Sequence, residues 1–214
     1  RKVMESALLK SCAMIAMLLM SCCCLMGCQE RDEIGDLAVV LGTALELEDD
    51  GNLQVSVELA HKTSIDGEDE SLVFTVSAPD WQTAEEELST ELDKTIYWGH
   101  MVLIVLGTGF TEEQIYDYME MFYRDQRLSP IIYIALSHMD TEDLLSATFG
   151  EATYLSQGVA ERLSAESKEN KEDSLTVGKY MQNIYYQGSG TQMALLSQVG
   201  DNIQLSGMVA VNEF

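Results

Sequence analysis

Cysteine is absent from most of this sequence, which has five cysteines among 214 residues and none after Cys28. The chain beyond that point can therefore form no intramolecular disulfide, even in an oxidising compartment where disulfides persist. Proline is also scarce, with two residues, and no low-complexity tract interrupts the chain. The 187 residues from Cys28 onward are enough for one large or two small domains, which a hydrophobic core must stabilise.

Basic residues are few as well, with 12 Lys and Arg against 36 Asp and Glu. The first 27 residues hold three of the bases and one of the acids, so the remainder has nine bases against 35 acids, a formal net charge of −26. Such a surface repels phosphate backbones, which argues against binding to nucleic acid. It is also repelled by anionic lipid head groups, so a basic patch cannot hold the protein at a membrane. The same charge also suits solubility alone.

The cysteines cluster in a segment that has the anatomy of a secretory leader. Arg1, Lys2 and Lys10 precede the uncharged run Ser11–Gly27, and a basic flank, an apolar core and small residues before a processing point characterise such leaders. The run ends in Leu25-Met26-Gly27-Cys28, which resembles a bacterial lipobox. In lipoproteins the thiol of that cysteine is acylated, with palmitate for example, and the chain is cut just before it. The expected function of Cys28 is therefore attachment to a bilayer.

The lipobox predicts three parts: a signal peptide over residues 1–27, the lipidated Cys28 with a short linker over 28–36, and a globular domain over 37–214. Two other interpretations of the uncharged run stay open. It could be an uncleaved transmembrane helix, although 17 residues is at the short limit for crossing a hydrocarbon core, or an ordinary leader in which cysteine is small apolar filler.

The attachment site also has an alternative, because Leu19-Met20-Ser21-Cys22 fits the same pattern. We prefer Cys28 to Cys22, since charged residues begin two positions after Cys28, at Glu30.

The rest of the chain alternates between strand-like and helix-like patterns. Strands are expected over Leu37–Leu47, Leu53–Leu59, Leu72–Val76, Met101–Leu106, Ile131–Leu136, Met193–Leu196 and Ile203–Val211. Helices are expected after Asp80 and after Thr111, and over Thr141–Ala147, Leu155–Ser167 and Leu175–Tyr186, with a charged loop over Glu166–Asp173. Turn signals at 49–52 and 200–202 make hairpins near both ends. This order predicts an α+β fold, a mixed β-sheet with helices packed on it.

Local patterns make these expectations specific. Asp80 is a plausible N-cap, and Thr111 through Gln114 form a capping box. In the second strand Gln54, Ser56 and Glu58 alternate with apolar residues, which predicts one face in water.

The expected core lies in and beside the two most apolar strands. Its members are Trp98, Val102, Ile104, Ile132 and Ile134.

Catalytic and metal-binding patterns are largely missing. His61, His100 and His138 are far apart, and none has a second ligand at metal-site spacing. His100 stands at the start of a strand, where a hydrogen-bonded structural imidazole is a better interpretation than a base. There is no cysteine nucleophile in the mature protein and no Gly-x-Ser-x-Gly elbow. We therefore expect no catalytic residues, no cofactor, no metal site and no enzymatic activity.

Two further patterns have ordinary structural explanations. Gly107-Thr108-Gly109 lies between a strand and a helix, as a dinucleotide-binding turn does, but its third glycine is missing. The acids at the start of the helix would also repel a pyrophosphate. Tyr116, Tyr118, Phe122 and Tyr123 have helical spacing, which predicts core packing with one exposed ring.

Several segments together resemble the Ger(x)C spore-germination lipoproteins, the C subunits of germinant receptors. The resemblance begins at Cys28 and the Asp36-Leu37-Ala38 opening, where Gln29 replaces the family's aromatic residue. It is most specific over Thr95–Gly107, where Gly-His precedes a hydrophobic strand. It continues through Arg124-Asp125 and ends at Leu205–Val211, in order along the chain.

Membership would imply a non-enzymatic, lipid-anchored subunit on the outer face of the spore inner membrane. Its partners would be the integral-membrane A and B type subunits of a nutrient germinant receptor, and its role would be assembly or signal coupling. The family's further C-terminal domain is absent from this sequence, which stops at Phe214. The alternative function is a lipid-anchored solute-binding protein of a transporter, although such proteins are usually longer. A surface-anchored hydrolase is a third possibility, which lacks a nucleophile–base pair.

Overall fold

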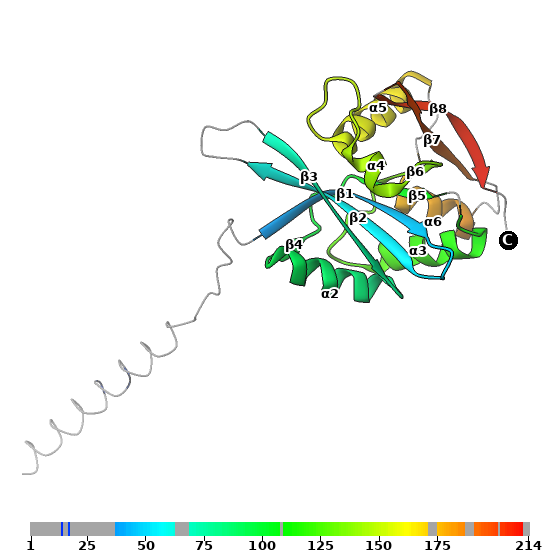
Figure 1. The fold of residues 1–214 in the computed structure, drawn as a ribbon. Helices are drawn as coiled ribbons and strands as arrows, with labels where there is room; N and C mark the ends of the chain where they lie inside the picture. Colours follow the sequence, from blue (N-terminus) through cyan, green and yellow to red (C-terminus); the bar gives the residue numbers. More distant parts are fainter. Residues whose placement is uncertain are drawn as a thin grey trace, which may run out of the picture. The chain divides into compact units, whose positions relative to one another are not determined.

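The fold is taken from a computed structural model that describes Met14, Met17 and residues 37–62, 69–107, 109–170, 175–186, 191–200 and 202–211. The predicted signal peptide, Cys22, Cys28 and the linker lie outside these residues. Asp36–Phe214 forms a compact unit of its own, and the description below concerns that unit (Figure 1).

The strands are β1 (Leu37–Leu47), β2 (Leu53–Lys62), β3 (Asp69–Ala78), β4 (Thr95–Tyr97), β5 (Leu103–Gly107), β6 (Tyr133–Ser137), β7 (Thr191–Val199) and β8 (Asn202–Val211). The helices are α2 (Trp81–Leu92), α3 (Glu112–Arg124), α4 (Thr141–Ser146), α5 (Leu155–Asn170) and α6 (Val177–Tyr186).

All eight strands belong to one mixed sheet, which confirms the predicted α+β class. The order is β3-β2-β1-β5-β6-β7-β8, with β4 also paired to β1. The centre, β1-β5-β6-β7, is parallel. The antiparallel pairs β1-β2, β2-β3 and β7-β8 flank it. The hairpins predicted near both ends of the chain therefore form the two outer parts of the sheet.

Helices cover both faces of this sheet (Figure 1). On one face, α2, α3 and α6 pack over a cluster that includes Ile104, Ile132 and Ile134. On the other, α4 and α5 pack over a second cluster that includes Leu103, Val105 and Ala135. Successive side chains of a strand point to opposite faces, which is why β5 supplies both cores. Burial on both faces also explains the continuous apolar run of this strand.

A β-bulge in β1 adjusts the strand to the two cores. The register with β2 shifts between Val40 and Gly42. One inserted residue in a strand changes the face of the sheet to which each following side chain points. Val40 and Leu45 consequently face the same core, although an odd number of positions separates them. A Cβ on Gly42 would lie 1.9 Å from the Ser156 hydroxyl oxygen, so glycine allows α5 to approach the sheet.

Both predicted helix starts are confirmed. The Asp80 carboxylate accepts a hydrogen bond from the main-chain N–H of Thr83 at 2.8 Å and caps α2. Thr111 and Gln114 form the reciprocal pair of a capping box at the start of α3. These bonds satisfy N–H groups that the first helical turn leaves unpaired.

The prediction that one face of β2 lies in water is wrong. The side chains of Ser56 and Glu58 are fully buried, and Gln54 is partly buried, because α4 and α5 cover this face. The Ser56 hydroxyl is hydrogen-bonded to the hydroxyls of Thr75 (2.8 Å) and Thr141 (2.9 Å). The alternation of β2 therefore separates an apolar core from a polar, hydrogen-bonded interior layer.

Glu58 organises that layer by capping α5. Its carboxylate accepts hydrogen bonds from the main-chain N–H groups of Leu155 (2.7 Å) and Ser156 (2.8 Å), and from the Ser71 hydroxyl at 2.9 Å. A buried charge requires such partners, and the positive end of the helix dipole favours a carboxylate. Glu58 is therefore the residue that fixes the start of α5 against the sheet.

Four of the five predicted core residues are buried, whereas Val102 is partly exposed because β5 begins one residue after it. The predicted loop Glu166–Asp173 is wrong over its first part, since α5 continues to Asn170. The strand predicted over Ile131–Leu136 begins two residues later, at Tyr133, and Ile131 is 73% exposed.

Candidate functional site

One set of hydrogen-bonded side chains at the surface comes from α2, the turn before β5 and the turn after α3. The buried face of α2 consists of Trp81, Ala84 and Leu88. The acidic residues of α2 lie on its other faces. Glu85 lies at the border between the buried and the exposed faces and is partly buried. The helix thus presents Glu85 to its neighbours while Trp81 anchors it in the core.

Trp98 is placed by an interruption in the sheet. β4 and β5 pair with successive parts of β1, and the chain leaves the sheet between them. Trp98 fills that position and is 2% exposed. Its ring lies 5.2 Å from that of Trp81, which in turn makes an edge contact with Phe122 at 4.9 Å. A buried indole N–H needs an acceptor, and Glu85 Oε1 accepts it at 2.8 Å.

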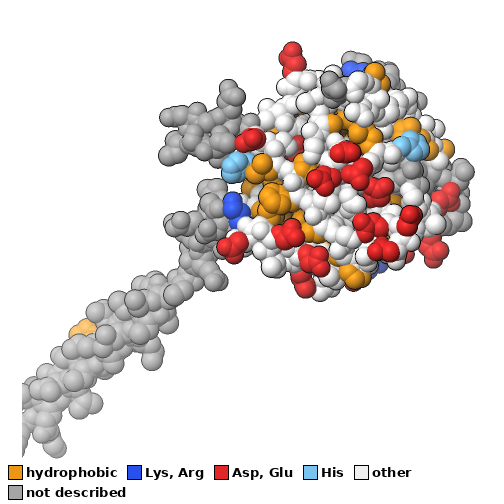
Figure 2. Space-filling model, in the orientation of Figure 1, with side chains coloured by type: hydrophobic (Ala, Val, Ile, Leu, Met, Phe, Trp, Pro, Cys, Tyr) orange, Lys and Arg blue, Asp and Glu red, His pale blue; other side chains and the backbone are white. Residues whose placement is uncertain are grey.

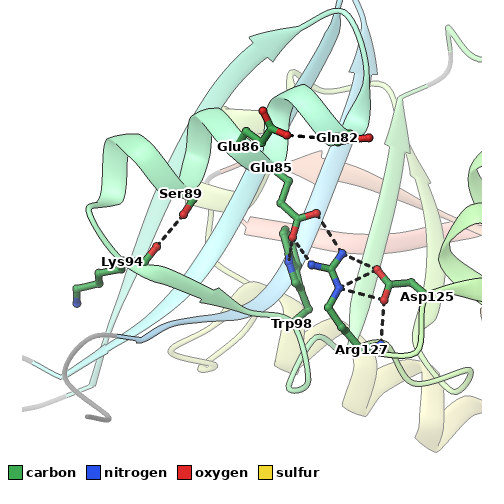
Figure 3. Close-up of polar contacts among 8 residues, drawn as sticks. All are labelled: Gln82, Glu85, Glu86, Ser89, Lys94, Trp98, Asp125 and Arg127. Carbon is green, nitrogen blue, oxygen red and sulfur yellow. Dashed lines mark hydrogen bonds and ion pairs between the residues drawn. The ribbon is translucent and has the colours of Figure 1, made fainter. Parts of the chain in front are cut away.

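Arg127 joins this pair to the turn after α3 (Figure 3). Its Nη1 forms an ion pair with Glu85 Oε1, and its Nη2 donates to Glu85 Oε2 at 3.1 Å. The guanidinium also donates to Asp125, from Nη2 to Oδ2 at 2.7 Å and from Nε to Oδ1 at 3.0 Å. We call Glu85, Trp98, Asp125 and Arg127 the Arg127 cluster.

Hydrogen bonding within the Arg127 cluster favours the charged forms of Asp125 and Arg127. The hydrogen bonds from Arg127 lower the pKa of Asp125. Hydrogen bonds to Asp125 and then to Glu85 raise the pKa of the Arg127 guanidinium. Two carboxylates thus share one cation, and half of the arginine side chain (52%) stays exposed. A guanidinium does not deprotonate in proteins, so this arrangement suits binding better than proton transfer.

Two shallow hollows flank Arg127. One, of about 370 Å³, lies between α2 and β4 and is lined by Gln82, Glu85, Glu86, Ser89, Thr95, Ile96 and Arg127. The other, of about 400 Å³, lies between α2 and α3 and is lined by Trp81, Gln82, Glu85, Met121, Phe122, Asp125 and Arg127. Both are at the low end of the range for small-molecule sites. Gln82, Glu85 and Arg127 line both hollows.

The histidines lie on separate elements. His61 is near the end of β2, His138 follows β6, and His100 precedes β5. His100 is exposed, with its ring 5.5 Å from that of Tyr97. The expected hydrogen-bonded, structural imidazole is therefore a surface side chain packed on a tyrosine. In the part of the chain that the structure describes, no group of His, Cys, Asp and Glu could hold a metal ion.

The remaining sequence patterns have the expected structural explanations. Gly107 ends β5, and Glu112 occupies the first turn of α3, where an anion would otherwise bind. Among the aromatic residues of α3, Phe122 is buried, Tyr116 and Tyr118 are partly buried and Tyr123 is exposed. The prediction of core packing with one exposed ring is therefore confirmed.

The sequence analysis did not identify Arg127 and Glu85 as functional candidates. They are 42 positions apart, and charged residues are too common in this chain to single out a pair. The useful signal is Trp98, since a buried indole implies an acceptor. Arg124-Asp125 was one of the segments that resemble the family. Asp125 joins the cluster, whereas Arg124 pairs with Glu120 on the surface at 2.7 Å.

None of the helices within the described residues is both long and apolar enough to cross a membrane. The face of the domain in Figure 2 carries many acidic side chains and few basic ones.

Comparison with known proteins identifies the family. Residues 30–198 match the model described as the spore germination protein N-terminal domain, and the chain belongs to this family. Spore germination protein GerQC of Bacillus cereus is 19% identical over 188 residues, which are 86% of this chain and 51% of that protein. The chain thus spans about half the length of this curated relative. No solved structure matches this chain significantly. The predicted resemblance to the amino-terminal part of Ger(x)C proteins is confirmed.

Proposed function

We propose that this protein is a non-enzymatic subunit of a nutrient germinant receptor and that it acts in receptor assembly or signal coupling. The observation that carries the proposal is the family match, which extends over residues 30–198. The Arg127 cluster is compatible with it, because its charged groups are paired with one another and Arg127 presents donors at an exposed position. The partners would be the integral-membrane A and B type subunits.

The second part of the proposal concerns location. Residues 1–27 would be a lipoprotein signal peptide, Cys28 would carry the lipid, and the domain from residue 37 would stand on the extracytoplasmic face of the spore inner membrane. One acyl chain anchors a protein only marginally, and stable attachment takes two signals. A diacylated cysteine meets this requirement, and the net charge of −26 in the remainder supplies no electrostatic attraction to anionic lipids.

Lipidation can be tested separately from germination. When the protein is expressed in a bacterium supplied with labelled palmitate, we expect label on the wild type and none on Cys28→Ala. The Cys28→Ala protein should also leave the membrane fraction. Cys22→Ala is the matched control and should keep its label. Label retained by Cys28→Ala but lost by Cys22→Ala would place the attachment site at Cys22. The absence of label from the wild type and from both variants would contradict the lipid anchor.

The receptor role requires an experiment in spores. Deleting the gene should abolish or slow germination triggered by nutrients. Germination triggered by external dipicolinate or a cationic surfactant bypasses nutrient receptors and should persist. If nutrient germination were unchanged for every nutrient to which the parent spores respond, the proposed function would be wrong. Loss of both responses would place the defect downstream of the receptor and would also contradict it.

A further inference from the structure

The polar layer that α4 and α5 cover contains a second glutamate, Glu46, whose surroundings are the opposite of those of Glu58. Glu46 pairs with Gln54 between β1 and β2, so the two side chains point to the same face of the sheet. Glu46 is partly buried, and its Oε2 atom is buried without a hydrogen-bond partner among the described residues. Both carboxylate oxygens of Glu58, in contrast, accept hydrogen bonds from N–H groups. A buried oxygen without a donor disfavours a negative charge.

The start of α4 lies beside this unsatisfied oxygen. Asp140 caps the helix by accepting hydrogen bonds from two main-chain N–H groups of the first turn. The Thr141 hydroxyl attaches the same turn to β2, with hydrogen bonds to Ser56 at 2.9 Å and to Gln54 at 3.1 Å. The main-chain N–H of Thr141 faces the Glu46 carboxylate. The attachment of α4 to the sheet and the environment of Glu46 therefore involve the same residues.

The surroundings of Glu46 favour its protonated form. Burial raises the pKa of Glu46, and the negative charges of Asp140 and of Glu48 raise it further, against the hydrogen bond from the main chain of α4. The neighbouring strands supply no compensating cation: the partner on β2 is uncharged, and a Cβ on Gly107 of β5 would lie 3.4 Å from Glu46 Cγ. Asp140 and Glu48 are thus the charges that act on Glu46 among the described residues.

This raised pKa has a definite effect on stability. A carboxyl group whose pKa is higher in the folded than in the unfolded chain stabilises the fold below its unfolded value, and this contribution is lost as the pH rises through the higher folded value. Asp80, Glu120 and Asp125 have lowered pKa values, so they act in the opposite direction, and only below the ordinary range of a carboxylate. Above that range the effect of Glu46 should be visible.

We propose that Glu46 is a proton-dependent latch for α4. The protonated carboxyl group offers a donor and places no second negative charge beside Asp140, so the start of the helix stays attached to the sheet. At neutral pH the ionised, unpaired carboxylate loosens this attachment, and α4 opens more often. Because α4 covers Ser56 and Gln54, opening exposes the polar layer to water. This latch does not depend on the proposed function.

Unfolding as a function of pH tests the energetic part. Glu46→Gln resembles the protonated form, because the glutamine side chain has one acceptor oxygen, one donor group and no charge. A pKa that is one higher in the folded chain corresponds to about 3–5 °C in the melting temperature of a domain of this size. Between about pH 4 and pH 7 the melting temperature of Glu46→Gln should therefore rise relative to wild type by at least about 3 °C.

The matched control is Asp49→Asn, which removes an exposed acid just after β1. Its difference from wild type should stay constant within about 1 °C over the same pH range. A difference for Glu46→Gln that does not grow, or that grows equally for Asp49→Asn, would overturn the proposal. Calcium or magnesium that stabilises the wild type but not Glu46→Gln would make Glu46 a metal ligand and would overturn it as well.

Hydrogen exchange tests whether α4 is the element that loosens. The main-chain N–H groups of α4 should exchange about tenfold faster in the wild type than in Glu46→Gln at pH 7, and at equal rates at about pH 4. Those of α2, on the other face of the sheet, should exchange at the same rate in both proteins. Equal rates in α4 at pH 7 would contradict the latch, and so would the same factor in α2 and α4, which indicates a change in global stability alone.

Discussion

Replacing Glu58 with glutamine should destabilise the domain strongly, although the change removes a single charge and almost no volume. Glu58 Oε1 accepts hydrogen bonds from the Leu155 N–H and the Ser71 hydroxyl, and Oε2 accepts one from the Ser156 N–H. The glutamine side chain has one acceptor oxygen and a donor NH₂ group. Whichever way the amide is oriented, a buried donor at the start of α5 then faces another donor.

The cost follows from these contacts. An unsatisfied buried N–H costs about 1–3 kcal/mol, and loss of a charge at a helix N-terminus costs about 0.3–1 kcal/mol. We therefore expect Glu58→Gln to lower the free energy of unfolding by about 2–3 kcal/mol. For a domain of this size each kcal/mol shifts the midpoint by roughly 2–4 °C, so the melting temperature should fall by about 4–12 °C.

Thermal and urea unfolding of the purified protein, followed by circular dichroism, measure this effect. Glu70→Gln is the matched control, because Glu70 lies on the neighbouring strand β3 and is exposed. It should change stability by no more than about 0.5 kcal/mol. Ser71→Ala should be intermediate, at about 1 kcal/mol, since Glu58 keeps both main-chain donors. Equal midpoints for Glu58→Gln and Glu70→Gln would refute the capping role.

Two further predictions concern the core and the Arg127 cluster. Ile104→Ala should cost about 2–5 kcal/mol, because Ile104 is fully buried in the central strand β5; an unchanged urea midpoint would show that this strand is not central. Glu85→Leu should cost about 1–3 kcal/mol by leaving the Trp98 N–H without its acceptor, whereas Glu85→Gln keeps an acceptor and should lose less. Urea unfolding followed by tryptophan fluorescence measures the difference, and equal losses would contradict the role assigned to that bond.

Most elements could be predicted because their signals are local. The Asp80 cap and the Thr111 capping box depend on bonds within three residues, and both were correct. The continuous apolar run of β5 correctly indicated a strand buried on both faces. What local signals do not contain is the pairing order. The parallel neighbours of β5 are β1 and β6. β2, β3, α2 and β4 separate β1 from β5 along the chain, and α3 separates β5 from β6.

The main error, at Glu58, shows the limit of periodicity. Alternation along β2 correctly indicated two different faces, but it does not say which of them faces water. The outcome is decided by α5, whose first residues lie 97 positions later in the chain. The Arg127 cluster escaped prediction for the same reason, since Glu85 and Arg127 are 42 positions apart. The sequence analysis expected Trp98 to be buried but did not ask which side chain accepts its indole N–H, the one signal that leads to Glu85.

The strong negative charge and the proposed anchor are compatible because electrostatic repulsion acts over a short range. At physiological ionic strength the Debye length is about 8 Å, so an acidic domain and an anionic bilayer repel one another only when they nearly touch. The nine residues of the predicted linker, 28–36, can span at most about 30 Å. An anchored domain of this charge should therefore stand off from the lipid yet stay within reach of membrane proteins beside it.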